Sequence, residues 1–138
     1  MRQELMFGPM AALVALTFAV ALVMVRARFR AAKLGHVTRA DFRLGESERV
    51  PPQVAVINRN YMNLLQAPVL FYVACLAFHA AGEADRTALW LAWAYVAFRV
   101  AHTAVHLTSN NVMHRLAAFG LSMGVLAAMW VWLVARVF

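Results

Sequence analysis

The sequence predicts an all-α integral membrane protein, an up-down four-helix bundle formed by a single domain of residues 1–138. Hydrophobic residues make up 64% of the chain and charged residues only 14%, far outside the range of ordinary soluble domains. Apolar stretches long enough to cross a bilayer recur along the chain. The acidic residues all lie near the first residues or in the segments between these stretches.

The first helix is expected over about residues 6–26, which at 1.5 Å per residue span roughly 30 Å, one hydrocarbon thickness. The basic residues follow this segment, so we interpret it as a retained helix and not as a signal peptide. A basic loop is expected over about residues 27–53, and the positive-inside rule places it in the cytoplasm. Helical structure can continue through Arg28 and Arg30 for another turn or two.

The second helix is expected over about residues 54–81, after Pro51-Pro52, which opens it. Pro68 removes a backbone hydrogen bond, so a kink is expected there. Arg59, Asn63 and Gln66 fall at spacings of four and seven residues and therefore share one helix face. Polar groups on one face of a membrane helix point inward, to other helices or to a wet cavity.

The third and fourth helices are expected over about residues 87–107 and 112–134, joined by a break that offers an N-cap at Asn111. The nearly neutral turn before the third helix belongs on the outer side, which also places both termini outside. Lys33 is the only lysine, which favours a GC-rich bacterial genome and hence a bacterial inner membrane.

The formal charge is +7, and seven of the 13 basic residues lie between the first two apolar stretches, from Arg26 to Arg49. This placement predicts contact with anionic lipid and argues against nucleic-acid binding. Cys75 is the single cysteine, so no disulfide within the chain and no cysteine metal framework are possible. We expect no metal cofactor.

Cationic and polar side chains from all four expected helices lie at one depth, on the cytoplasmic side. They are Arg26 on the first, Arg59 on the second, Arg99, His102 and His106 on one face of the third, and Arg115 in the first turn of the fourth. An arginine within a membrane normally meets a carboxylate or faces water. Either a loop carboxylate (Asp41, Glu46 or Glu48) folds back to meet Arg59 or Arg115, or the missing anion is a ligand.

Two motifs resemble the membrane-associated proteins in eicosanoid and glutathione metabolism, the MAPEG family. The first is Arg99-Val-Ala-His102-Thr followed by Arg115, and the second is Arg59-Asn60-x-x-Asn63 followed by Pro68. The resemblance implies a homotrimer that holds glutathione between subunits near the cytoplasmic side. It implies that Arg115 is catalytic and stabilises the glutathione thiolate. It also implies that His102, Arg59 and Asn60 match glutathione-binding positions and that Arg26 or Arg28 matches a basic contact from the first helix. We expect Asn63, His106 and Arg28 in the same glutathione site. Pro68 is expected to brace the bundle, and Arg99 either braces the bundle or a neighbouring subunit or contacts the ligand.

The chain departs from the pattern that this resemblance implies at positions that would carry hydrogen-bonding groups. Asn63 replaces a carboxylate, His106 and Phe119 replace tyrosines, and Leu116 replaces a serine.

Two functions follow. The first is a transferase or peroxidase that uses glutathione, or a similar thiol, on lipophilic substrates in the membrane. The second is a non-enzymatic membrane scaffold that binds a lipid or fatty acid in the same cationic pocket.

Overall fold

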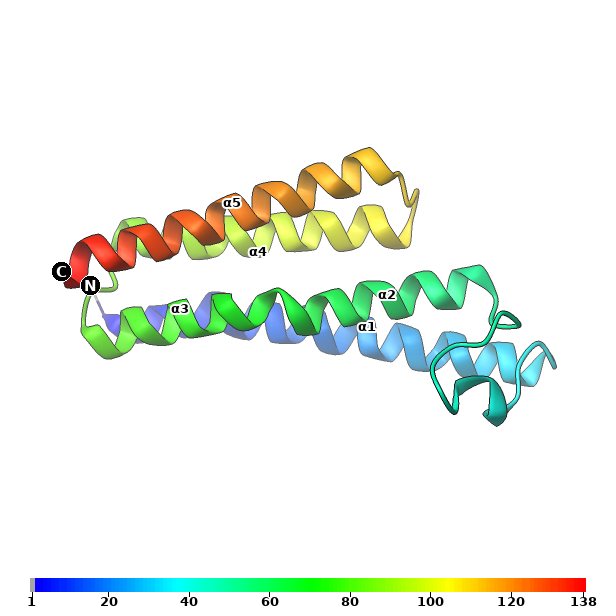
Figure 1. The fold of residues 1–138 in the computed structure, drawn as a ribbon. Helices are drawn as coiled ribbons and strands as arrows, with labels where there is room; N and C mark the ends of the chain where they lie inside the picture. Colours follow the sequence, from blue (N-terminus) through cyan, green and yellow to red (C-terminus); the bar gives the residue numbers. More distant parts are fainter. Residues whose placement is uncertain (1) are drawn as a thin grey trace.

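The computed structural model describes residues 2–138, which are helical apart from the connecting turns and one loop (Figure 1). Four segments are long and apolar enough to cross a membrane: Gln3–Lys33, Pro52–Ala81, Arg86–Leu107 and Val112–Val137. The expected four-helix architecture is therefore confirmed. Both termini lie at one end of the bundle, and the long loop lies at the other end.

The first span is longer than expected from hydropathy alone. A 3-10 turn, η1 (Gln3–Met6), leads into α1 (Phe7–Lys33), which ends seven residues beyond the expected residue 26. The added turns contain Ala31 and Ala32, strong helix formers. Arg30 and Lys33 lie in the last turn, where positive charge interacts favourably with the helix dipole. The cationic end of α1 therefore projects as regular helix.

The second span consists of two helices, α2 (Pro52–Gln66) and α3 (Pro68–Ala81), that meet at Ala67. The expected single kinked helix is thus divided into two α-helical segments, although they run on as one span in Figure 1. The physical reason is Pro68, which has no backbone N–H to donate to the preceding turn and is placed at the first position of α3.

The third and fourth spans are α4 (Arg86–Leu107) and α5 (Val112–Val137). Gly82, with φ of 73°, ends α3, and its N–H donates to the His79 carbonyl at 3.2 Å. Asp85 caps α4 by accepting from the Ala88 N–H at 2.7 Å, and the same carboxylate accepts from Trp132 Nε1 at 3.2 Å. One carboxylate therefore ties the start of α4 to the end of α5.

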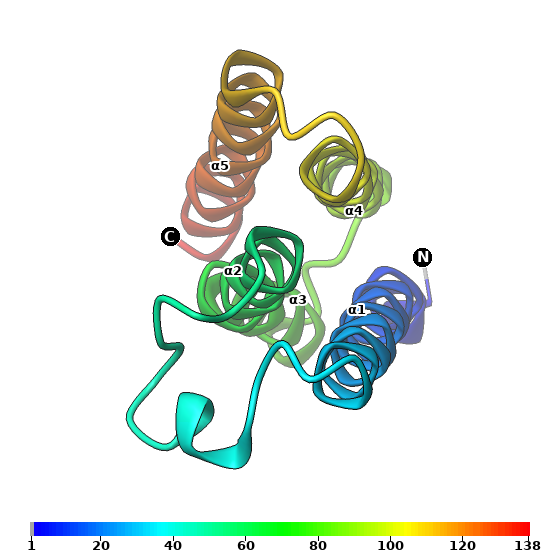
Figure 2. The same cartoon turned by 90° about the vertical axis from the view of Figure 1, so that its right-hand side faces the viewer.

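The helices form a bundle in which α5 lies beside α4, and α1 lies beside α2 and α3 (Figure 2). The shared core includes the rings of Phe71 and Tyr95, which stack with centroids 4.5 Å apart. Toward the loop end, α5 diverges from α2 in both views (Figures 1 and 2). Among the described residues, no α-carbon of α2 lies within 8 Å of one in α5. The beginning of α5 is therefore supported by α4 alone.

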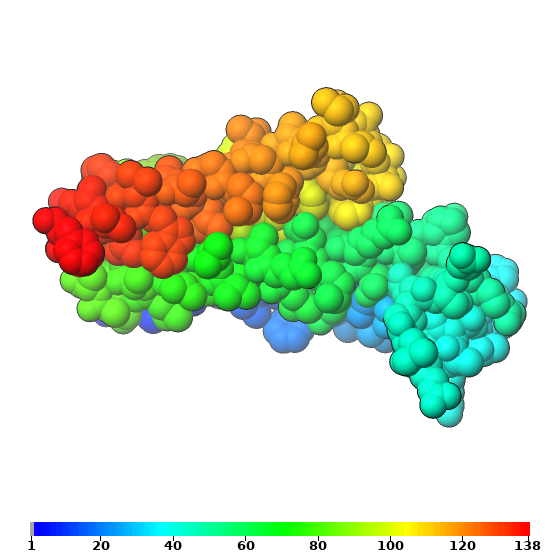
Figure 3. Space-filling model, in the orientation of Figure 1, coloured from blue at the N-terminus to red at the C-terminus, as the bar shows by residue number. Residues whose placement is uncertain are grey.

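The loop between α1 and α2 is folded and projects from the end of the bundle (Figure 3). Asp41, in the 3-10 turn η2 (Arg39–Phe42), accepts from the Thr38 N–H at 2.7 Å, the Thr38 hydroxyl at 2.9 Å and the Ser47 hydroxyl at 2.7 Å. Val37 and Val50 pack on the ends of α1 and α2 in a small second core. The loop is therefore held both by its own polar groups and by apolar packing on the two helices.

Replacing Asp85 with alanine should lower the free energy of unfolding by about 2 kcal/mol, because α4 loses its cap and Trp132 its acceptor. The measurement is chemical unfolding of the protein in detergent. Glu48→Ala, which removes an exposed loop carboxylate, is the control and should leave stability unchanged. Equal stability of both variants would contradict the shared role of Asp85.

The Asp41 carboxyl should titrate well below its ordinary range. Hydrogen bonds from Ser47, and then from the Thr38 backbone and side chain, lower its pKa from 3.8 to about 2. A depressed pKa stabilises the loop above pH 3.8, and this contribution is lost as the pH falls through about 2. Carboxyl NMR titration measures the midpoint. Ser47→Ala should raise it, Ser109→Ala should not, and a wild-type midpoint near 3.8 would refute the assignment.

Candidate functional site

The site begins with a row of buried polar side chains on one face of α4. Arg99, His102, Thr103 and His106 are all buried inside the bundle, at spacings of three and four residues. The expected common face of Arg99, His102 and His106 is therefore confirmed. These side chains contact residues of α2 and α5 and carry the polar row from the middle of α4 to its C-terminal end.

Arg99 is fully buried, and only its Nη2 finds acceptors, both on α2, while its Nε and Nη1 are buried without a partner among the described residues. Its Nη2 donates to the backbone oxygen of Asn63 at 3.1 Å and also to the Asn63 side-chain oxygen. Its guanidinium carbon lies 5.8 Å from the centre of the Phe119 ring, a distance that suits a cation–π contact. The Asn63 side-chain oxygen is thus engaged with Arg99.

Asn60 lies one turn before Asn63 and is also fully buried. Its Oδ1 accepts a long hydrogen bond of 3.5 Å from the Thr103 hydroxyl, while its Nδ2 is buried without a partner in the described chain. The sequence did not point to Thr103, although its position one residue after His102 places it at the edge of the same face. This pair joins α2 and α4 beside Arg99.

Arg115 lies in the first turn of α5, half-buried, and is held by two neighbours. Its Nη1 donates to Asn110 Oδ1 at 2.8 Å and lies 3.4 Å from His106 Nε2. Asn110 adopts a positive φ of 48°, and its N–H donates to the Val105 carbonyl at 2.8 Å. Asparagine tolerates a positive φ better than most residues do. This tolerance is the only feature of the sequence that indicates a special role for Asn110 in the turn. The guanidinium is therefore positioned from the α4–α5 turn.

Arg59 completes the group from α2. Its side chain is exposed, whereas that of Arg115 is half-buried. The positive charges of both arginines act on the His106 imidazole. Within residues 2–138, the Arg59 side chain makes no hydrogen bond or ion pair. The ion pairs of this part of the chain are Arg28–Glu46 and Arg136–Glu83. The loop carboxylates therefore do not fold back onto Arg59 or Arg115, which leaves a cationic group without an internal anion.

Arg28 belongs to a different cluster, formed with the loop. Its Nη2 lies 3.3 Å from Glu46 Oε1 and donates to Asn58 Oδ1 at 3.2 Å, and its guanidinium lies 4.7 Å from the centre of the Phe42 ring. These contacts join α1 to the loop and to α2. Arg28 is therefore not brought together with Arg115 within this chain.

The remaining neighbours of the cluster are apolar. The Phe119 ring lies 5.9 Å from the His102 ring, which in turn contacts the His106 ring edge-to-face at 5.5 Å. Leu116, next to Arg115, is 60% exposed on the outer side of α5. We refer to Arg59, Asn60, His102, His106 and Arg115 as the cationic cluster. Its donors, with an apolar surround and no carboxylate, suit an anion of a small molecule.

Asn63→Ala should destabilise the bundle by about 2 to 3 kcal/mol, because Arg99 would keep its buried charge but lose a side-chain acceptor. Thermal unfolding in detergent measures the effect. Gln66→Ala, an exposed position on the same helix, is the control. Asn63→Asp retains a side-chain acceptor for Arg99, so its unfolding temperature should stay close to that of the wild type. A large loss of stability in Asn63→Asp but none in Asn63→Ala would overturn this account.

Comparison with known proteins agrees with this arrangement. No match was found among curated proteins, and none among solved structures. A family model, described as the MAPEG family, matches residues 6–135, nearly the whole chain and all four spans. The chain therefore belongs to the MAPEG family, and it is an integral membrane four-helix protein.

Proposed function

We propose that this protein is a membrane S-transferase or peroxidase that uses glutathione, or a similar thiol, on lipophilic electrophiles. The observation that carries the proposal is that Arg115, beside His106 of α4, and Arg59, on the neighbouring α2, both lack a carboxylate partner among the described residues. Membership in a glutathione-related membrane family supports the choice of thiol. Arg115 is the proposed catalytic residue.

Glutathione supplies the anions that the cationic cluster lacks. It carries carboxylates and a thiol that becomes anionic, and arginine binds such groups through charge-assisted hydrogen bonds. Arg59 is exposed and free of protein partners, so it suits a carboxylate. Asn60 and His102 have orphaned nitrogens, Nδ2 and Nδ1, that support a polar role behind the arginines. Arg28 and Asn63 have protein partners and are weaker candidates.

Arg115 would act by favouring the thiolate over the thiol, which lowers the pKa of the bound thiol. The proton leaves to solvent, and the thiolate sulfur then attacks an electrophilic carbon, forming a carbon–sulfur bond as the leaving group departs. With a hydroperoxide, two glutathione molecules supply two electrons, and the products are an alcohol, water and glutathione disulfide. Asn110 would hold Arg115 in position throughout.

We further propose a homotrimer in the bacterial inner membrane, with the cationic cluster on the cytoplasmic side and both termini outside. The placement follows the basic loop, which lies at the same end of the bundle as the start of α5 (Figure 1). Arg59 is exposed and Arg115 only half-buried in the single subunit, so a neighbouring subunit would cover a ligand bound between them. Lipophilic substrates would arrive through the adjoining bilayer.

A second function is favoured by the apolar neighbours of the cluster. Phe119 lies against His102, and Leu116 follows Arg115, so no hydroxyl is offered at these two positions. The same cations would then bind an anionic lipid head group or a fatty acid without turnover. In that case the fourth span, α5, would mainly serve to pack the helices together.

Arg115→Ala should abolish the ultraviolet absorbance of the thiolate that appears when glutathione is added to the wild-type protein. The reason is that the guanidinium charge favouring the ionised thiol is removed. Arg86→Ala, which removes an exposed arginine at the opposite end of the bundle, is the matched control and should retain the signal. A wild-type protein with neither thiolate absorbance nor thiol binding would refute the enzyme proposal.

Native mass spectrometry separates the two functions. An enzyme should show glutathione adducts that are lost in Arg115→Ala and retained in Arg86→Ala. A lipid-binding protein should instead keep a co-purified anionic lipid that excess glutathione does not displace and that Arg115→Ala releases. The same spectra report whether three copies of the chain associate.

A further inference from the structure

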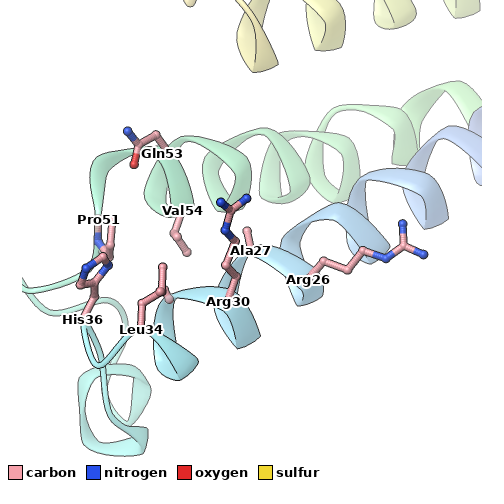
Figure 4. A pocket seen from close by; sticks show the side chains of 9 residues that line it. Arg26, Ala27, Arg30, Leu34, His36, Pro51, Gln53 and Val54 are labelled. Atoms are coloured by element: carbon pink, nitrogen blue, oxygen red, sulfur yellow. The ribbon is translucent and has the colours of Figure 1, made fainter.

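A cavity of about 510 Å³ lies between the cytoplasmic end of α1 and the beginning of α2 (Figure 4). Arg26 and Arg30 line it from α1, and Gln53 and Val54 line it from α2. Figure 4 shows the Arg30 guanidinium directed toward α2 and that of Arg26 further along α1, toward the body of the span. This volume falls in the range of small-molecule sites. The cavity shares no residue with the cationic cluster.

The two arginines of this cavity are unneutralised. Arg26 and Arg30 are exposed, and neither side chain makes a hydrogen bond or ion pair with the described residues. Arg28, between them in sequence, points to the loop and uses Glu46. His36 and Gln53 add polar groups at the far end of the cavity. A guanidinium without a carboxylate partner attracts an anion. Arg30 directs its guanidinium toward α2 beside the cavity, while Arg26 lines the cavity and turns its guanidinium along α1, toward the bilayer (Figure 4). Phosphate oxygens match the planar set of donors that arginine offers.

The depth of the cavity places it at the membrane surface. The first span, Gln3–Lys33, has 31 residues, or about 46 Å of helix, whereas the hydrocarbon core needs roughly 30 Å. The excess lies at the cationic end, so Arg26 and Arg30 reach the level of the lipid phosphates. Leu22 and Val23 precede Arg26 by four and three residues, share its face and are exposed. Apolar surface therefore continues from the cavity into the bilayer.

We infer that this cavity binds the phosphate group of an anionic phospholipid, with the acyl chains lying along Leu22 and Val23 of α1. Arg30 holds the phosphate oxygens from within the cavity, and Arg26 adds positive charge at the bilayer edge of the cavity. The remaining walls, including Leu34 and Val54, contact the glycerol region and the polar end group reaches His36 and Gln53. A soluble phosphate ester offers the same anion but leaves the apolar path beyond Arg26 unused, which is why a lipid is the favoured source. This site is separate from the proposed thiol site.

The test uses the full-length protein in detergent, with binding followed by native mass spectrometry. The probes are dioleoylphosphatidylglycerol, dioleoylphosphatidylcholine with the same chains, and soluble glycerol 3-phosphate. Arg26→Gln combined with Arg30→Gln should weaken phosphatidylglycerol binding at least about tenfold, as expected from losing charge-assisted hydrogen bonds. Arg39→Gln combined with Arg43→Gln removes the same charge from the exposed loop outside this cavity and should change the affinity by less than about twofold.

Other results would overturn the inference. Equal binding of phosphatidylcholine, or equal losses in both double variants, would show general lipid contact. Displacement by glycerol 3-phosphate would show a soluble phosphate ligand, and displacement by glutathione would assign the cavity to the thiol site. As a measurement on the unaltered chain, a photoactivatable phosphatidylglycerol should label residues 26–36 or 51–54, and labelling elsewhere would contradict the site.

Discussion

The hydrogen bonds from Arg99 to Asn63 fix α4 against α2, and the cationic cluster depends on that alignment. A fully buried guanidinium requires acceptors, and α2 supplies a backbone and a side-chain oxygen at one residue. With α4 held, His102 and His106 follow on the same face, and His106 comes within 3.4 Å of Arg115. Because Asn63 is an amide, it accepts hydrogen bonds without neutralising the charge, so the surroundings stay electropositive.

The folding of the basic loop decides which cations remain free. Asp41 is used by Thr38 and Ser47, and Glu46 pairs with Arg28. Asp41 is therefore committed to hydrogen bonds within the loop, and Glu46 ties the loop to Arg28 of α1, so neither acid is available to arginines elsewhere. The consequence is that the loop end of the bundle has two kinds of arginine: Arg28, which pairs with the loop, and others whose side chains have no partner among the described residues.

Much of this architecture could be predicted from the sequence, because span length, apolar composition and helical spacing are local properties. The common face of Arg99, His102 and His106 follows from the 3.6-residue period alone. The partner of Arg28 could not be predicted, since three loop acids lie within reach and only the folded loop selects Glu46. Asn110 was missed because its contact with Arg115 depends on a left-handed backbone in the α4–α5 turn.

The neighbours of Arg115 restrict how it can promote the proposed reaction. Asn110 orients the guanidinium, His106 lies beside it, and Phe119 packs on the adjoining His102. A thiolate here would be stabilised chiefly by charge, since Leu116 and Phe119 donate no hydrogen bonds. Apolar surroundings strengthen such an interaction by excluding water. Thiolate formation would then depend on how completely the guanidinium is shielded from solvent, which makes the covering of this half-buried side chain a requirement for activity.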